Sequence, residues 1–223
     1  MASAGRENLD AAHVSRYDAK EDARASAEVD LLLGLGMDHE SVVVDIGAGT
    51  GQFALAVAPV CGRVVAVDVS PVMLRTLQSN VTRSGRSNIE VVQAGFLTYE
   101  QHGTPADVVY SRYALHHLPD AWKAIALTRI RRMLAPGGVF RLWDVVYGFP
   151  PGQAEERIER WCADGFDDVG SRWDREELEE HVRDEHSTFT WLLEPMIQRA
   201  GFEIRTADYS DDGFFATYVL DAA

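Results

Sequence analysis

Short apolar runs alternate with longer segments of helical spacing along most of the chain. The apolar runs are rich in β-branched residues and predict buried strands at 42–44, 63–68, 89–93, 106–111 and 139–146. The spacing of apolar positions between them predicts helices at 52–59, 71–84 and 119–134. Because strand and helix alternate from 42 to 146, we expect a parallel sheet with helices on both faces, which is a doubly wound α/β fold.

Both flanks of this core carry further patterns. Residues 19–35 predict a leading helix whose apolar face would carry Ala23, Ala27, Leu31 and Leu35. From 148 to 200 the pattern changes, and three helical segments are expected at 154–166, 175–185 and 189–200. This stretch is too long for a plain connection and predicts a helical cap insertion. Two closing strands are expected at 202–206 and 213–220, within one domain that spans 1–223.

The stretch from 42 to 51 reads Val-Val-Val-Asp-Ile-Gly-Ala-Gly-Thr-Gly. Alternate glycines let a strand turn at once into a helix and remove side chains that would keep a ligand off the backbone. A helix that begins there offers free N–H donors, while Asp45 adds a carboxylate that repels phosphate and favours an ammonium or hydroxyl group. The turn therefore suits a nucleoside carrying an amino acid better than a pyrophosphate. A tight turn without any ligand is the simpler alternative.

These residues resemble the first motif of the class I S-adenosylmethionine (SAM)-dependent methyltransferases, acidic-x-Gly-x-Gly-x-Gly. The dinucleotide fingerprint would instead require a glycine at position 52, which is Gln52. Residues 134–140, a leucine followed by a Pro-Gly-Gly turn and a strand, are similar to a later motif of the family. The resemblance implies a Rossmann-like seven-stranded sheet with an antiparallel last strand, a leading lid helix within 1–36, SAM as cofactor and a small-molecule methyl acceptor.

Asp68 ends the second expected strand, where a carboxylate can accept both ribose hydroxyls of a bound nucleoside. The family usually lays a side chain over the adenosine at the position of Met73, although a core methionine fits as well. Tyr17 precedes the leading helix and is either a lid residue or an ordinary half-buried aromatic. Gly95 stands where many relatives carry an adenine-binding Asp, which is a departure from the family pattern. The expected cofactor-binding residues are Tyr17, Asp45, Gly47, Ala48, Gly49, Thr50, Gly51, Asp68, Val69, Met73, Gly95, Phe96, Ser111 and Arg112.

Residues 111–118, Ser-Arg-Tyr-Ala-Leu-His-His-Leu, follow the fourth expected strand and are similar to a Leu-His-His-Leu segment of this family. The resemblance places the reacting methyl group near them. His116 is the candidate catalytic residue, because an imidazole titrates near neutral pH and can orient or deprotonate an acceptor. The alternative is that His116 caps a helix or bonds a backbone carbonyl, and a structural role is expected for His117. We expect no metal, since adjacent side chains diverge and no carboxylate is spaced to complete a site.

A second polar cluster occupies 181–188 in the expected cap. On a helix, Asp184 and Glu185 can contact His181, which would make a base held by a carboxylate; a solvated, charged helix face is the alternative. Arg183 or Arg112 can clamp a substrate carboxylate or phosphate. Four tryptophans, at 143, 161, 173 and 191, would line an aromatic acceptor pocket or pack in the core. The expected substrate-binding residues are Tyr113, His117, Trp143, Asp144, His181 and Arg183.

Composition limits the remaining choices. A net charge of −14 argues against a nucleic-acid surface, which would need clustered Lys and Arg. Two cysteines imply no disulfide framework and fit a reducing cytoplasm, and no long apolar run predicts a membrane span. We therefore expect a cytoplasmic SAM-dependent methyltransferase of small-molecule metabolism. A NAD-dependent oxidoreductase and a non-catalytic SAM-binding regulatory protein remain alternatives, the acceptor atom is open, and a homodimer is one option for the oligomeric state.

Overall fold

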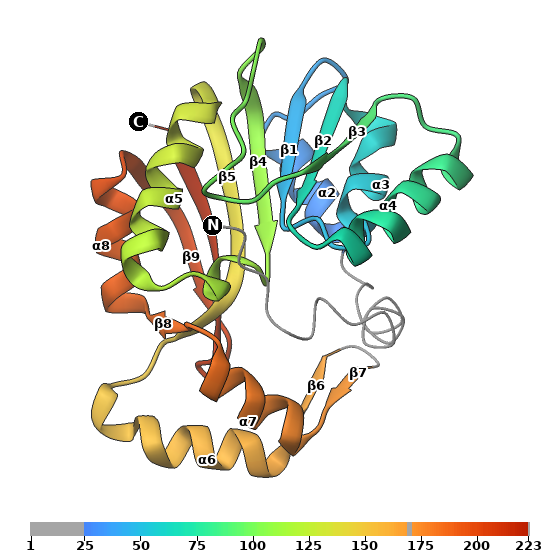
Figure 1. Cartoon of the computed structure of the whole chain (residues 1–223). Helices are drawn as coiled ribbons and strands as arrows, with labels where there is room; N and C mark the ends of the chain where they lie inside the picture. Colours follow the sequence, from blue (N-terminus) through green and yellow to red (C-terminus); the bar gives the residue numbers. More distant parts are fainter. Residues whose placement is uncertain (1–24, 169–170, 223) are drawn as a thin grey trace.

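A computed structural model describes residues 25–168 and 171–222 and shows one central sheet flanked by helices (Figure 1). The strands run in the order β3-β2-β1-β4-β5-β10-β9, and a short β8 pairs with β5. Strands β1 to β5 are parallel, whereas β10 is antiparallel to both β5 and β9. This confirms the predicted fold class. The strands are β1 (Val42–Ile46), β2 (Arg63–Asp68), β3 (Ile89–Gln93), β4 (Ala106–Arg112), β5 (Leu134–Tyr147), β8 (Thr188–Phe189), β9 (Phe202–Tyr209) and β10 (Phe215–Ala222).

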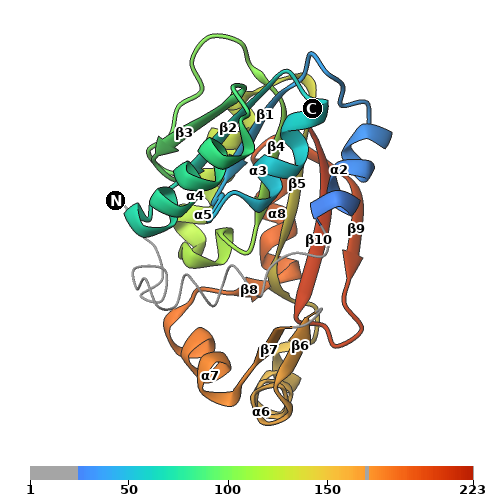
Figure 2. The same ribbon diagram turned by 90° about the vertical axis from the view of Figure 1, so that its right-hand side faces the viewer.

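Helices cover both faces of the sheet. One face carries α2, α3 and α4, and the other carries α5 and α8 (Figures 1 and 2). Within the described residues, no helix is both long enough and apolar enough to cross a membrane. The helices are α2 (Ala25–Gly34), α3 (Gln52–Val57), η2 (Ala58–Val60), α4 (Pro71–Ser84), η3 (Leu115–His117), α5 (Asp120–Met133), η4 (Pro151–Gln153), α6 (Ala154–Asp164), α7 (Arg175–Asp184) and α8 (Thr190–Arg199).

The alternation of side chains along β1 divides the interior into two cores. Val44 and Ile46 pack in the core beneath α5 and α8, and Val43 packs in the core beneath α2, α3 and α4. Successive side chains of a strand point to opposite faces, so a strand that is apolar at nearly every position can serve both cores. All five residues of β1 are buried, as expected for a central parallel strand.

The structure corrects the predicted apolar face of the leading helix. Residues 19–24 lie outside the described residues, and α2 turns another face inward than the predicted one: Leu31 is exposed, whereas Glu28 and Leu32 are buried. This inward face packs Val29 and Leu32 in the core and forms a buried ion pair, in which both carboxylate oxygens of Glu28 accept hydrogen bonds from Arg141 of β5.

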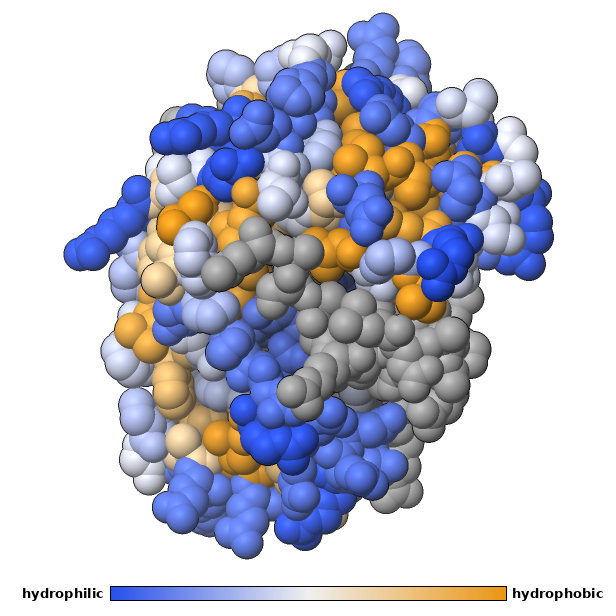
Figure 3. Space-filling view, in the orientation of Figure 1, coloured by the Kyte–Doolittle hydropathy of each residue, from blue (hydrophilic) through white to orange (hydrophobic). Residues whose placement is uncertain are grey.

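The segment after β5 forms a cap beyond one end of the sheet, built from α6, α7 and a small antiparallel pair, β6 (Phe166–Asp168) and β7 (Ser171–Trp173) (Figures 1 and 2). A third apolar cluster, which includes Tyr147, Trp161, Leu178 and Phe214, joins the cap to β5 and β10. The outer surface over α6 and α7 is hydrophilic (Figure 3). The three predicted helices are present, but α8 packs on the sheet, and the β6–β7 pair was not predicted.

Candidate active site

The glycine turn after β1 is held against the end of β2. The backbone N–H groups of Gly47 and Ala48 both donate to the carbonyl of Val67, at 2.8 and 3.0 Å. The three glycines at 47, 49 and 51 have φ angles of 81°, 54° and 90°, in the left-handed region that other residues rarely adopt. The sequence therefore needs glycine here to turn the chain from β1 into α3.

Two of these glycines also allow close packing. A Cβ at Gly47 would lie 2.3 Å from the Cβ of Ala114, and a Cβ at Gly51 would lie 2.9 Å from Cγ of Leu77. Both distances are shorter than real Cβ contacts, so a side chain would push the turn away from its neighbours. Gly49 meets nothing within 4 Å and lies on the open side.

Asp68 connects this turn to the end of β2. One of its carboxylate oxygens accepts a hydrogen bond from the Gly49 N–H at 2.9 Å, and the other accepts from the Ser70 N–H at 2.7 Å. Burial raises the pKa of Asp68, and the two backbone donors oppose that shift. Each oxygen keeps further lone pairs, so the carboxylate can still accept hydroxyl donors from a ligand.

Close packing explains why position 95 carries a glycine. A Cβ there would lie 2.5 Å from Cγ1 of Val69, which comes from the adjoining end of β2. Val69 thus occupies the space that the first carbon of an Asp side chain would need. The neighbouring Phe96 is buried, and its exposed fraction is 7%. Position 95 therefore offers backbone groups and no side chain.

Other predicted cofactor residues gather around the same turn. A small pocket beside it is lined in part by Asp45, Gly47, Ala48, Thr50 and Arg112. Met73 and Ser111 are nearly fully buried, with exposed fractions of 2% and 0%. Tyr17 lies outside the described residues. The turn, the end of β2 and the end of β4 therefore meet at one edge of the sheet, where the glycines add no side chains.

At the same edge, His116 and Asp144 form a buried pair. Nδ1 of His116 lies 2.5 Å from Oδ1 of Asp144, and the His116 backbone N–H donates to Oδ2 of the same carboxylate at 3.1 Å. Val145 also donates its N–H to Oδ1 at 2.8 Å. Because Asp144 only accepts when ionised, we assign the ring proton of His116 to Nδ1, which leaves the lone pair of Nε2 available.

The protonation states follow from burial and from this pairing. Burial lowers the pKa of His116, and the Asp144 carboxylate only partly offsets that effect. Burial alone would raise the pKa of Asp144, but its interaction with His116 and its hydrogen bonds bring that pKa below the usual value. The pair therefore consists of an ionised carboxylate and a neutral imidazole, which is the state of a base ready to accept a proton.

The cap adds further polar groups to this pair. Nδ1 of His117 lies 2.5 Å from Oε2 of Glu185, directly after α7, and the rings of His116 and His117 are 4.3 Å apart. The ring of His181 is 5.0 Å from that of His116, and its Nε2 lies 3.0 Å from Oγ of Ser187. Burial lowers the pKa of His181 to about 3, whereas that of Glu185 is about 2, because its contacts with His117 outweigh the effect of burial.

This arrangement corrects two arguments made from the sequence. The side chains of His116 and His117 do not diverge, and a carboxylate does approach them, from a residue that lies 68 positions further along the chain. The Glu185 carboxylate pairs with His117, and Glu185 bonds His181 only through its backbone N–H, which donates to the His181 carbonyl at 2.9 Å as the C-cap of α7. The contact with His117 depends on how the cap folds back onto the sheet, so residue spacing alone gave no signal for it.

The remaining predicted substrate residues divide into two groups. Tyr113 directly follows β4 and Trp143 lies within β5, with ring centroids 5.9 Å apart, and the Arg112 guanidinium lies 4.4 Å from the centre of the Trp143 ring. Tyr113 has a φ of 50°, the only positive φ of a non-glycine residue in the part of the chain that the structure describes. By contrast, Arg183 is exposed and pairs with its neighbour Asp184, and Trp191 is 54% exposed. The structure does not bring these last two to the site.

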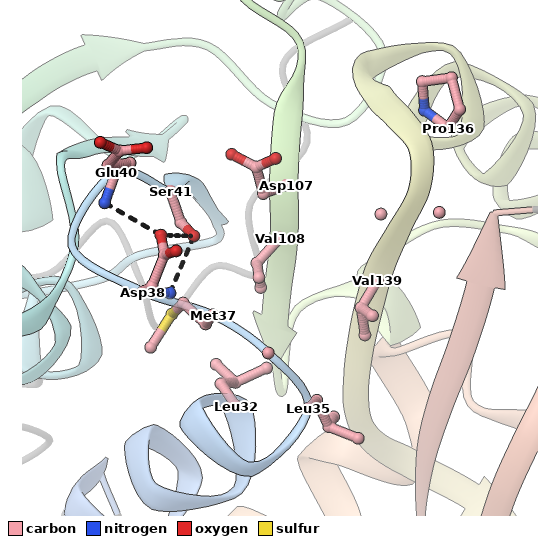
Figure 4. A pocket seen from close by; sticks show the side chains of 13 residues that line it. Leu32, Leu35, Met37, Asp38, Glu40, Ser41, Asp107, Val108, Pro136 and Val139 are labelled. Atoms are coloured by element: carbon pink, nitrogen blue, oxygen red, sulfur yellow. Dashed lines mark hydrogen bonds between the residues drawn. The ribbon is translucent and has the colours of Figure 1, made fainter.

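A larger cavity of about 450 Å³ lies at the opposite end of the sheet, between the α2–β1 loop and the start of β5 (Figure 4). Its acidic groups serve the fold itself. Asp107 accepts a hydrogen bond from the Val42 N–H at 2.8 Å, and Asp38 accepts from the Glu40 N–H and from the Ser41 hydroxyl. The ends of the parallel strands that carry the glycine turn lie away from this cavity, and ligands of open α/β sheets bind at those ends.

Comparison with known proteins agrees with this geometry. Residues 43–138 match the sequence model of the family described as "Methyltransferase domain". An uncharacterized methyltransferase of Geobacillus kaustophilus is 32% identical over 136 residues, which are 60% of this chain and 60% of that protein. The chain thus spans less than two thirds of that relative's length.

Solved structures show the same fold at low identity. A SAM-dependent methyltransferase from Aquifex aeolicus aligns with a TM-score of 0.67 at 15% identity, covering 96% of this chain and 99% of that one. Magnesium protoporphyrin IX methyltransferase from Synechocystis, solved with bound SAM, aligns with a TM-score of 0.62 at 13% identity over 89% and 78% of the two chains. Residues 43–138 thus carry a methyltransferase domain, and in its glycine turn and its fold the chain is similar to the class I methyltransferases that use S-adenosylmethionine.

Proposed function

We propose that the whole protein transfers the methyl group of SAM to a small-molecule acceptor bound between the edge of the sheet and the cap. The observation that carries this proposal is the buried His116–Asp144 pair, which lies where the strand ends that bear the glycine turn meet the cap. The cap and the aromatic side chains of Tyr113 and Trp143 would enclose a compact acceptor. The net charge of −14 favours a small neutral or cationic acceptor over a nucleic acid.

When bound, SAM would supply an electrophilic methyl group that passes in line to an acceptor lone pair while its carbon–sulfur bond breaks, with S-adenosylhomocysteine as the leaving group. The residues of this chain would do the rest. The glycine turn and Asp68 would hold the nucleoside, and the cap would exclude water. For an acceptor that carries a proton, Nε2 of His116 would take it while Asp144 holds Nδ1–H and stabilises the imidazolium. A neutral imidazole with a fixed tautomer needs no rearrangement before that step.

The proposal also includes the boundaries of the lid and cap segments within the domain. We keep 1–36 as the lid segment and 148–200 as the segment that contains the cap, with α8 packed on the sheet. The residues expected to bind cofactor and substrate stay predictions, as do the cytoplasmic location and the lack of a nucleic-acid partner. The acceptor atom is left open among oxygen, nitrogen and sulfur.

Calorimetric titration with SAM, S-adenosylhomocysteine and NAD in parallel tests the cofactor part. We expect both sulfur nucleosides to bind and NAD not to bind. Binding of NAD alone would overturn the proposal in favour of an oxidoreductase.

Transfer of labelled methyl groups from SAM to a panel of small hydroxy, amino and thiol compounds tests the reaction. We expect product from at least one class, and His116→Gln should lower turnover by about 10²–10⁴-fold with SAM affinity nearly unchanged. Normal turnover in that variant would remove His116 from catalysis. SAM binding without product from any acceptor class would favour a regulatory SAM-binding protein.

A further inference from the structure

Three potential metal-ligand atoms meet where the cap touches the sheet. One ring nitrogen each of His116 and His117 and one carboxylate oxygen of Glu185 all lie within 4.8 Å of one another. Two imidazoles and a carboxylate form a donor set that zinc and other divalent transition metals favour. These side chains come from η3 and from the end of α7, so the folding of the cap is what brings them together.

The surroundings of His116 match those of a metal-binding histidine. Asp144 accepts from Nδ1 at 2.5 Å, which leaves Nε2 as the ligand atom. Histidines that bind metals almost always donate their other ring N–H to a carboxylate or carbonyl, which fixes the ring and raises its basicity. Asp144 is itself fixed by the backbone N–H groups of His116 and Val145. Asp144 is therefore already in place as the carboxylate that orients a metal-binding histidine.

The charges at this point also favour a cation. The side chains of Asp144 and Glu185 are only 2% and 4% exposed. Three imidazoles lie near these carboxylates. His116 and His117 each pair with one of them, and the ring of His181 lies 5.0 Å from that of His116. Buried carboxylates are costly unless a cation balances them. One dication would balance both carboxylates and leave all three rings neutral.

We propose that His116, His117 and Glu185 form a binding site for one divalent transition-metal ion, with zinc as the best match to this donor set. The 2.5 Å contact between His117 and Glu185 is a hydrogen bond that holds a proton between the two groups. A zinc ion would take the place of that proton, and the metal–ligand distances usual for imidazole and carboxylate ligands are about 2.0–2.2 Å. Because Glu185 follows α7, the ion also ties the cap to the edge of the sheet.

The proposed metal site depends on the proposed function only in that both use His116 at the same edge of the sheet. Nε2 of His116 has a single lone pair, so it either accepts a proton or binds the ion. Three protein ligands leave the fourth position of a tetrahedral zinc site open. An acceptor oxygen or sulfur can fill that position and face the cofactor, and the ion then takes over the role of polarising the acceptor.

The test is zinc binding by the untagged full chain after treatment with a chelator. Equilibrium dialysis with metal analysis should show a single zinc ion per chain, and His117→Ala and Glu185→Gln should each weaken binding by at least about tenfold. His102→Ala is the matched control, because His102 is exposed on the loop between β3 and β4 and should leave zinc binding unchanged. Cobalt in place of zinc should give the visible absorption of a four-coordinate site that both variants lose.

Wild-type protein that holds no zinc at micromolar free metal would overturn the proposal, and so would variants that bind zinc like the wild type. SAM affinity, measured by calorimetry on every variant, shows that each one is folded. The two proposals fail separately. A chain that binds zinc but transfers no methyl group contradicts the proposed function alone, and a chain that transfers methyl groups without binding zinc contradicts the metal site alone.

Discussion

At the scale of single residues, Asp68 gives the most direct test of the cofactor site. Its carboxylate links the glycine turn to the end of β2 through the N–H groups of Gly49 and Ser70. We expect Asp68→Ala to weaken SAM binding by about 1–3 kcal/mol, because hydrogen bonds to a charged acceptor are lost. Calorimetric titration measures the change, and Glu90→Ala on the exposed side of β3 is the control. Unchanged affinity would place Asp68 outside the site.

His181 makes the protein sensitive to acid. Its pKa is about 3 in the folded chain against 6.5 for the free side chain, so the unfolded state binds the proton more readily. The contribution to stability is therefore complete above pH 6.5 and is lost as the pH falls toward 3. Glu185, with a pKa lowered from 4.5 to about 2, acts in the same direction but only below pH 4.5. The window between pH 6.5 and 5 thus reports on the histidines.

In that window we expect His181→Asn to reduce the acid-induced loss of unfolding free energy by about 1–2 kcal/mol at pH 5. Urea denaturation between pH 7.5 and 5, with chelator present, measures the loss. His102→Asn is the matched control, because His102 is an exposed histidine on the loop between β3 and β4. A His181→Asn profile that is parallel to the wild type would show that another group carries the acid sensitivity.

At the scale of elements, the start of α5 binds the segment that follows α7 and leads from the cap back to the sheet. Lys123 is only 2% exposed, and its ammonium donates to Oδ1 of Asp120 at 2.9 Å and to the carbonyl of His186. Oδ2 of Asp120 accepts from the Thr188 hydroxyl at 3.2 Å, and the His186 N–H donates to the carbonyl of His116. The segment after α7 is thereby fixed to both α5 and η3.

Replacing Lys123 with Met should release this segment. The carbonyl of His186 then loses its charged donor, and Asp120 loses its cation, so amide hydrogen exchange in 185–189 should rise by about tenfold or more. Arg132→Met is the control, since Arg132 is exposed on the same helix. The prediction is contradicted if exchange in this segment is equal in the two variants.

The core elements were predictable because each rests on local chemistry. Strands β2 and β3 and helix α4 have the predicted limits, and Ser70 caps α4 by accepting from the Met73 N–H at 3.3 Å. The inward face of α2 was not predictable, because a partner 113 positions away draws Glu28 inside. In the candidate site, the glycine turn follows from the sequence in the same local way. The contact between His117 and Glu185 depends on the folded position of the cap, which no local pattern specifies.

At the scale of the whole molecule, a buried ion pair joins α2 to the centre of the sheet. Nε and Nη2 of Arg141 donate to the two carboxylate oxygens of Glu28 at 2.7 and 2.8 Å. Both side chains are 7% exposed, and Arg141 lies in the middle of β5. Helix α2 covers the core that contains Val43 of β1. Because the glycine turn directly follows β1, the ion pair helps to stabilise the part of the sheet that carries this turn.

Breaking this pair on one side should cost more than removing it altogether. Glu28→Gln leaves the Arg141 charge buried without its anion, and we expect a loss of about 3–5 kcal/mol in the free energy of unfolding. Replacing both residues with Leu and Met should recover most of that loss, because no buried charge is left to desolvate. Urea denaturation of the single and double variants measures both effects, and Asp221→Asn, which breaks the Arg205 pair on the surface, should cost at most about 1 kcal/mol. A Glu28→Gln variant as stable as the Asp221→Asn control would mean that water reaches the pair and that apolar packing alone holds α2 on the sheet.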